Sequence, residues 1–441
     1  MMFSQLRLYS ISRTFAITAC LFFLGCLAPA FAIDEPEFPW GRNSRILFFG
    51  DSITQAGGYI NDVEAFLFTR FPAGNETVIN HGISSETISG TSEPDHDPRR
   101  PDAQERFERD VENWEPDVLV ACFGMNDGNY LPPELAPMAA YQAGVNKLIE
   151  RTKRAGIPQI VLLTPPPFDP YRRQSGDANA THYGYKFAAI NYDDTLAGFA
   201  AWLKTLQSLP NLRVIDLHTK LNEHLKARRQ ERVSFYLAGD AVHPNSTGHL
   251  LMAANLLKGL GPIPPLASAE IDAKSREVKS GRIQFQSPGE ALLRLTWTTG
   301  LPWPLPADVD QDSVKLESIG ATFNRLDLTI DGLDDGQYEA FGQAGDQAEQ
   351  SLGTFQSSAG KAHAQLSFPE SAPFFATEAA TFRTKLEARN QARYSAWRAA
   401  IQTADFTDDL HLPANDPKLT RELQELATAR PWELIIKRRQ P

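Results

Sequence analysis

The sequence of 441 residues has little cysteine, no excess of positive charge and no long apolar run, and each absence excludes a class of protein. Of its three cysteines, Cys20 and Cys26 lie near the N-terminus, so Cys122 has no partner for an intrachain disulfide in the remaining chain. A formal net charge of −11 repels a phosphate backbone and disfavours general nucleic-acid binding. No His-x-x-x-His pair indicates zinc, and we expect neither a metal nor a cofactor.

The first 32 residues follow the pattern of a secretory signal peptide. Two arginines precede an apolar run at 15–27, which is shorter than the roughly 20 residues of a membrane span, and Ala-Phe-Ala follows at 30–32. We expect cleavage after Ala32, export to the periplasm or the extracellular space, and no stable membrane span afterwards. The alternative is lipid attachment at Cys26, because the residues before it loosely resemble a lipobox.

Residues 44–260 alternate short apolar runs with helical patterns, which predicts a parallel sheet covered by helices on both faces. The expected strands lie at 45–49, 77–79, 118–123, 159–163 and 212–215. The expected helices lie at 62–71, 103–114, 139–155 and 186–206, and a last one follows Pro244, capped by Asn245 or Ser246. The fold class is therefore α/β, a three-layer αβα sandwich with a five-stranded parallel sheet.

A Pro-rich linker at 261–268 separates this catalytic domain from residues 269–441, where the pattern changes to alternation. The runs at 326–330 and 337–341 flank Asp334-Asp335-Gly336 and predict a β-hairpin. A helical pattern follows, with Phe382, Leu386, Tyr394, Trp397 and Ile401 roughly on one face. We expect a β-rich module followed by helices, to which the sequence assigns no function.

Four polar segments occupy the carboxyl edge of the predicted sheet, where open parallel sheets bind their ligands. The first three strands are followed by Gly50-Asp51-Ser52, Asn80-His81-Gly82 and Gly124-Met125-Asn126, and Asp240-Ala241-Val242-His243 precedes the last helix. Each segment alone is ordinary turn chemistry. Their order and their positions together indicate a catalytic site.

These segments contain the groups that acyl transfer requires. A serine hydroxyl needs a base to become a nucleophile, and His243 can serve Ser52 in that role. Asp240, three residues before the histidine, can orient its imidazole and stabilise the cation. The oxyanion would be met by the N–H groups of Ser52 and Gly82 and by the side-chain amide of Asn126. At Gly82 the missing side chain would let the substrate carbonyl approach the backbone.

Simpler roles suit the other polar residues nearby. Asp51 is expected to support the turn, and His81 to be structural or to support the site from outside it. His249 is a competing base, but it lacks an Asp-x-x partner. His96 lies between two aspartates in a loop rich in proline and arginine, which is usually solvated and does not indicate a metal site.

The four segments resemble the consensus blocks of the SGNH, or GDSL-type, esterase and lipase superfamily of serine hydrolases. The resemblance covers about residues 44–260 and implies a flavodoxin-like αβα fold. It also implies Ser52 as nucleophile, Gly82 and Asn126 as oxyanion donors, and Asp240 with His243 completing the triad. One departure is a serine at position 85, where many members have glycine, and this affects the expected shape of the loop. The C-terminal half looks similar to the extensions of large bacterial members and implies no activity.

We therefore expect an exported serine esterase that hydrolyses short-chain acyl esters through an acyl-serine intermediate. Acetyl esters of carbohydrates are the expected class, on the resemblance and on export. One alternative is an acyltransferase or a lipase that uses the same triad, depending on what intercepts the acyl-enzyme. The other is a non-catalytic carbohydrate-binding protein on the same fold, against which the complete set of site residues argues.

Overall fold

The computed structural model describes residue 40 and residues 43–72, 74–172, 182–287, 292–368, 375–403 and 412–439. The predicted signal peptide lies outside these residues. The described residues all belong to one compact unit. Within these ranges no helix has both the length and the apolar character to cross a membrane.

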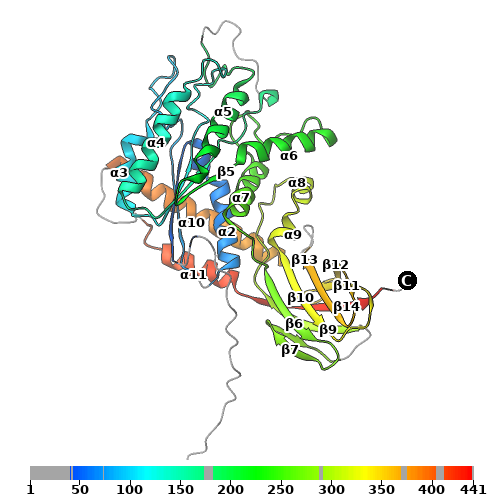
Figure 1. The fold of residues 1–441 in the computed structure, drawn as a ribbon. Helices are drawn as coiled ribbons and strands as arrows, with labels where there is room; N and C mark the ends of the chain where they lie inside the picture. Colours follow the sequence, from blue (N-terminus) through cyan, green and yellow to red (C-terminus); the bar gives the residue numbers. More distant parts are fainter. Residues whose placement is uncertain are drawn as a thin grey trace, which may run out of the picture. The chain divides into compact units, whose positions relative to one another are not determined.

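Five parallel strands form the central sheet, in the order β2-β1-β3-β4-β5 (Figure 1). They are β1 (Arg45–Gly50), β2 (Thr77–Gly82), β3 (Val118–Cys122), β4 (Gln159–Leu163) and β5 (Leu212–Ile215). In this register Gly50 pairs with Gly82 on one side and with Cys122 on the other. Every residue of β3 is buried, as expected for a central strand covered on both faces. The predicted α/β class and five-stranded parallel sheet are confirmed.

The helices of this part are α1 (Ser52–Ala56), α2 (Gly58–Arg70), α3 (Phe107–Asp110), α4 (Met138–Arg154), α5 (Tyr192–Thr205), α6 (Leu217–Glu231) and α7 (Ser246–Leu260). The expected cap of the last helix is present, because the Asn245 side chain accepts a hydrogen bond from the Gly248 N–H at 3.0 Å. Where one helix was expected at 103–114, the structure has only the short α3 between two 3₁₀ turns. The helix α6 was not among the expected ones. The helix expected from 186 begins at Tyr192, and residues 182–187 before it line a cavity described below.

Two further sheets follow, with orders β13-β10-β6-β7 and β12-β11-β14-β9-β8. Their strands are β6 (Ala267–Asp272), β7 (Glu277–Ser280), β8 (Ile283–Phe285), β9 (Leu293–Thr299), β10 (Arg325–Asp331), β11 (Gly336–Gln343), β12 (Gln350–Ser357), β13 (Lys361–Ser367) and β14 (Arg430–Arg438). The predicted hairpin is wrong, because β10 and β11 belong to different sheets. Both strands bury alternate residues, and the turn between them carries the chain from one sheet to the other.

The chain then forms the long helix α10 (Ala376–Thr403) and α11 (Asp416–Ala427) before it re-enters the second sheet as β14. α10 packs against α2 and β2 of the first part (Figure 1). Of the five residues expected on one face of α10, Phe382, Leu386 and Trp397 are buried, and Tyr394 and Ile401 are only partly buried. The long helix α10 therefore joins the C-terminal half to the part of the chain that forms the central sheet.

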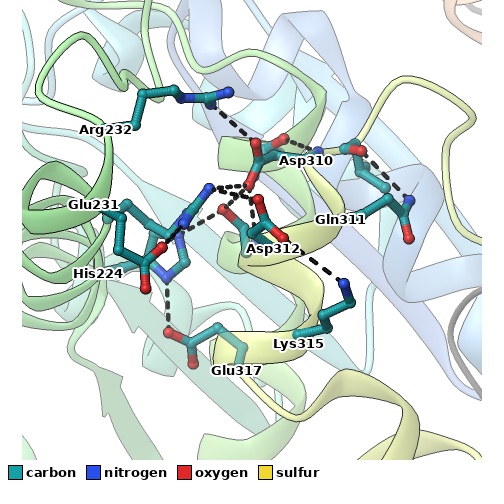
Figure 2. A network of polar contacts seen from close by, with 12 residues as sticks. His224, Glu231, Arg232, Asp310, Gln311, Asp312, Lys315 and Glu317 are labelled. Atoms are coloured by element: carbon teal, nitrogen blue, oxygen red, sulfur yellow. Dashed lines mark hydrogen bonds and ion pairs between the residues drawn. The ribbon is translucent and has the colours of Figure 1, made fainter.

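A polar network joins α6 to α8 (Gln311–Leu316), a helix that follows β9 (Figure 2). The buried His224 ring contacts Glu317 Oε1 at 2.8 Å and Ser313 Oγ at 2.9 Å. Arg228 and Arg232 both donate to Asp310, at 3.0 and 2.9 Å. Because these partners are about 80 residues or more apart in sequence, the network holds the segment after the linker against the first part.

An aromatic cluster makes the same connection through apolar contacts. Phe66 in α2 packs edge-on against Trp303 and against Phe323 of α9 (Ile319–Phe323), with ring centroids 6.0 and 5.7 Å apart. The Trp303 indole donates to the Asp62 carbonyl at 2.9 Å. All three rings are buried, so the two parts share one core at this point.

The substitution Phe66→Ala tests this shared core. We expect it to lower the free energy of unfolding by about 3–5 kcal/mol, because it leaves a cavity beside the rings of Trp303 and Phe323. Urea denaturation measures the change. Leu135→Ala is the control, since Leu135 is 60% exposed and its loss should cost less than about 0.5 kcal/mol. Equal effects of the two substitutions would contradict a core shared through Phe66.

Candidate active site

The structure brings Ser52, His243 and Asp240 into one chain of hydrogen bonds. Ser52 Oγ lies 2.9 Å from His243 Nε2, and His243 Nδ1 lies 2.6 Å from Asp240 Oδ2. The imidazole is thus held between a hydroxyl and a carboxylate, the arrangement in which it can take a proton from the hydroxyl. The His243 side chain is 40% exposed, so a ligand can reach the imidazole.

Several donors hold the Asp240 carboxylate. Its Oδ1 accepts from the N–H groups of Val242 and His243, and its Oδ2 also accepts from the Tyr185 hydroxyl at 3.0 Å. Partial burial raises the pKa of Asp240, but the hydrogen bonds from His243 and from the backbone outweigh it and hold that pKa well below its usual range. Asp240 therefore stays ionised beside the imidazole. Tyr185 was not predicted, because it lies 55 residues from Asp240 in sequence.

The turn after β1 presents Ser52. Asp51 caps the short helix α1, since its Oδ1 accepts from the Ile53 N–H at 3.0 Å. A side chain at Gly50 would clash with Thr54 and with the Cys122 carbonyl, so the close turn requires glycine there. Asp51 thus supports the turn, as expected for it.

Asn126, at the end of β3, lies beside Ser52 on the same cavity wall. Its Oδ1 accepts from the Tyr130 hydroxyl at 3.1 Å, and its Nδ2 donates to the Glu86 carbonyl at 3.0 Å. The second contact fixes which end of the amide is the donor, because a backbone carbonyl can only accept. It uses one of the two hydrogens on Nδ2 and leaves the other for a ligand.

The position of Gly82 differs from the expectation for it. Its N–H donates to Asn80 Oδ1 at 2.9 Å, and Gly82 does not line the cavity that contains Ser52. A Cβ on this residue would lie 2.1 Å from the backbone nitrogen of Gln55. The missing side chain therefore allows α1 to pack on the end of β2. It does not serve to let a ligand approach the backbone.

Ser85, three residues further on, has the features expected of Gly82. It lines the cavity together with Ser52 and Asn126, and its N–H donates to no group in the described part of the chain. Its backbone has a φ of +66°, a left-handed conformation that favours glycine. The sequence signal was already present, because Ser85 is the position at which the resemblance expects glycine.

Partners from several elements hold the loop around Ser85. The Ser85 carbonyl accepts from Arg100, which is buried and paired with Glu93. The N–H groups of Ile88 and Ser89 both donate to Asp127 Oδ1 at 2.9 Å. Buried backbone groups need such partners, so the loop has little freedom to move.

Ser52 and His243 open into a cavity of about 690 Å³. Its wall mixes tyrosines with charged groups of both signs, contributed mainly by residues 84–100 and 182–187. The residues are Ser84, Ser85, Glu93, Asp95, His96, Asp97, Arg100, Asn126, Tyr130, His182, Tyr183, Gly184, Tyr185, Lys186 and Phe187. A cavity of this size and polarity suits a small polar ligand.

His249, His81 and His96 make their contacts with groups other than Ser52. His249 is buried and stacks on Tyr59, and burial lowers its pKa to about 4. His81 is also buried, and burial lowers its pKa to about 3. His96 contacts the Pro98 carbonyl at 2.6 Å on the cavity wall. Among the described residues no group of three or more His, Cys, Asp or Glu side chains could hold a metal ion.

The part of the chain that forms the central sheet is similar to known proteins. The model of the GDSL-like lipase/acylhydrolase family matches residues 48–251. An acetylxylan esterase from Geobacillus stearothermophilus is 25% identical over 247 residues, which cover 50% of this chain and 95% of that protein. A crystal structure of this esterase matches with a TM-score of 0.39 at 25% identity, over 51% of this chain and 96% of that one.

A second solved structure matches almost the whole chain. It is a gut microbial diltiazem-metabolizing enzyme, with a TM-score of 0.61 and 18% identity. The match covers 92% of this chain and 99% of that one. The fold is therefore shared through the C-terminal half as well as through the central sheet.

The buried Asp51 gives the stability of the protein a dependence on pH. Burial raises the pKa of its carboxyl from 3.8 to about 7; the Ile53 N–H opposes this rise and Asp127 adds to it. Between these two pH values the folded protein keeps a proton that the unfolded chain has lost, so stability falls as the pH rises. Asp51→Asn should remove this fall, which amounts to a few kcal/mol between pH 4 and 7.5.

Urea denaturation of wild type and variant at several pH values measures this effect. Asp346→Asn, in an exposed loop, is the matched control and should leave the pH profile of wild type unchanged. Parallel profiles for wild type and Asp51→Asn would show that the carboxyl does not carry a proton in the folded state.

The left-handed backbone at Ser85 predicts a gain in stability from Ser85→Gly. Relief of the strained φ is worth about 1–2 kcal/mol, and the added chain entropy of glycine offsets about 0.5–1 kcal/mol of this. We expect the free energy of unfolding to rise by up to about 1 kcal/mol. Ser84→Gly, at a neighbour without a positive φ, should instead lose stability. Urea denaturation that ranks the two variants the other way would contradict this conformation.

Proposed function

Residues 48–251 belong to the GDSL-like lipase/acylhydrolase family, and from this membership we propose that the protein is a serine esterase that cleaves short acyl esters with Ser52 as its nucleophile. The family and the related esterase support the activity of a carboxylic ester hydrolase. The observation that supports Ser52 as its nucleophile is the hydrogen-bonded chain from Ser52 through His243 to Asp240, which opens into the cavity.

In the first half of the proposed reaction, Ser52 Oγ attacks the ester carbonyl carbon while its proton moves to His243 Nε2. The imidazolium that forms is stabilised by Asp240, which the surrounding donors keep ionised. The tetrahedral intermediate then collapses, and the bond to the alcohol oxygen breaks. His243 returns the proton to the leaving alcohol, so that an acyl group remains on Ser52.

The oxyanion of the intermediate needs donors that are already in place. We assign the N–H of Ser52, the N–H of Ser85 and the second hydrogen of Asn126 Nδ2. Ser85 takes the role that the sequence pattern assigned to Gly82, since the Gly82 N–H is already engaged by Asn80. The unpartnered N–H of Ser85 and its place on the cavity wall support this assignment.

In the second half, a water molecule attacks the acyl carbon and His243 accepts its proton. Ser52 leaves with that proton, and the free acid is released. The same three donors stabilise the second oxyanion. The cavity in front of Ser52 and His243 gives water its access.

For the substrate we propose acetyl esters of carbohydrates. Tyrosines 130, 183 and 185 line the cavity beside charged groups, and such a wall can pack against sugar rings and hydrogen-bond their hydroxyls. The similarity to an acetylxylan esterase supports the same class. Export under the signal peptide at 1–32 belongs to this proposal on the sequence pattern alone and would place the enzyme where extracellular polysaccharide is met.

The substitution Ser52→Ala tests the nucleophile. We expect hydrolysis of nitrophenyl acetate to fall at least about 1,000-fold, because no acyl-enzyme can form without the hydroxyl. Ser84→Ala is the matched control, since Ser84 lines the same cavity but lies outside the hydrogen-bonded chain, and it should stay within a few-fold of wild type. Acetate should be preferred over butyrate and octanoate, and acetylated xylo-oligosaccharides should be deacetylated.

A fluorophosphonate probe separates the outcomes. Mass spectrometry should find the probe on Ser52 in wild type and in Ser84→Ala and should find no labelling in Ser52→Ala. A Ser52→Ala variant as active as wild type would overturn the serine mechanism. A wild-type protein that is neither labelled nor active on any ester would overturn the proposed function as a whole.

A further inference from the structure

The C-terminal helix α10 is anchored on the first part of the chain by buried charges. Arg389 pairs with Glu64 in α2, and both side chains are no more than 2% exposed. Arg383, six residues earlier on α10, pairs with Asp62, two residues earlier on α2. A buried charge that loses its partner is strongly unfavourable, so these pairs define where α10 lies along α2.

The same helix reaches the end of β2. Trp397 stacks nearly flat on His81, with centroids 4.1 Å apart and an angle of 13° between the rings. Trp114 packs at a right angle to the His81 ring, with centroids 4.8 Å apart, and His81 Nδ1 contacts the Asp110 carbonyl at 2.7 Å. His81 directly precedes Gly82, the first residue of the loop at 82–86 that contains Ser85. α10 therefore packs on the residue just before this loop.

Tyr394 completes this contact with a hydrogen bond to the loop itself. Its hydroxyl donates to the Gly82 carbonyl at 3.0 Å. The N–H of the same peptide, on Ile83, donates to the Gly50 carbonyl at 2.9 Å. The peptide plane between Gly82 and Ile83 is therefore held at both of its polar ends, by α10 on one side and by β1 on the other.

Both partners of this peptide contact lie close in sequence to the proposed catalytic groups. Gly50 is two residues before Ser52, and Gly82 is three residues before Ser85. Rotation of the plane would change the direction in which the chain leaves β2 and would move the Ser85 N–H. A displacement of about 1 Å at such a site can cost about 100-fold in rate.

We propose that Tyr394 is a positioning residue for the oxyanion loop at 82–86, so that the C-terminal helix forms part of the catalytic machinery. This proposal rests on the proposed function. Tyr394 touches no substrate atom, because it does not line the cavity with Ser52. It acts by fixing the Gly82–Ile83 peptide, and through it the donor at Ser85. The C-terminal half thereby gains a role that neither its sequence nor its fold suggested.

The test compares Tyr394→Phe with Tyr338→Phe. Both substitutions remove a tyrosine hydroxyl that donates to a backbone carbonyl, but Tyr338 contacts Asp334 in the β-rich part. With nitrophenyl acetate we expect Tyr394→Phe to lower kcat about 10-fold with KM within twofold of wild type. Tyr338→Phe should change neither constant by more than twofold.

Two further readouts distinguish positioning from packing. A trifluoromethyl ketone, which forms a tetrahedral adduct on the serine, should bind Tyr394→Phe more weakly by the same factor as kcat/KM falls. Hydrogen exchange should be faster at the Ile83 and Ser84 amides in Tyr394→Phe than in wild type, while the thermal unfolding temperature changes no more than in Tyr338→Phe.

The outcomes separate this proposal from the proposed function. If wild type shows activity that depends on Ser52 but Tyr394→Phe behaves like Tyr338→Phe, the positioning role is wrong and the esterase stands. If Tyr394→Phe loses activity only in proportion to a lost folded fraction, the positioning role is also wrong. If wild type has no activity that depends on Ser52, the proposed function fails first.

Discussion

The pairing of β1 with β2 on one side and β3 on the other is the constraint on which the candidate site depends. Because Gly50 is in register with both Gly82 and Cys122, the turns that follow these strands leave the sheet at the same edge. They place Ser52, Ser85 and Asn126 around one cavity. His243 comes from a loop 191 residues after Ser52, and the bonds from Asp240 to its backbone and its ring set its position.

The loop after β2 shows how the need to satisfy backbone groups shapes such a site. Its buried N–H and C=O groups are bound by different elements: Gly50, Gln55, Arg100, Asn126, Asp127 and Tyr394. Ser85 combines an unpartnered N–H with a left-handed backbone. Both features cost folding energy, and such costs persist where surrounding contacts impose them, which is common at sites that bind or react.

The sequence was sufficient to predict the five strands, their parallel direction and the polar residues at their ends, because each rests on a local pattern. It was not sufficient to choose between the N–H groups of Gly82 and Ser85 as the proposed oxyanion donor. That choice depends on where each N–H points and on whether Asn80 accepts a hydrogen bond from one of them. The hairpin between β10 and β11 failed for a similar reason: a turn motif does not say which sheet the next strand joins. The contact of Tyr394 with Gly82 spans 312 residues, and no local pattern encodes it.

The ion pairs between α10 and α2 explain why the C-terminal half is joined to the catalytic part by charges as well as by apolar contacts. Burial raises the pKa of Asp62 to about 6, although Arg383 opposes the rise, so the carboxylate costs more to bury than its partner returns. Pairs of this kind add little net stability. They penalise a register that moves Arg383 away, because Asp62 would then stay buried without its cation. Apolar packing alone tolerates such shifts more readily, whereas a hydroxyl that must meet one carbonyl does not. A helix that places Tyr394 opposite Gly82 therefore needs contacts that fix its register more than it needs contacts that add stability.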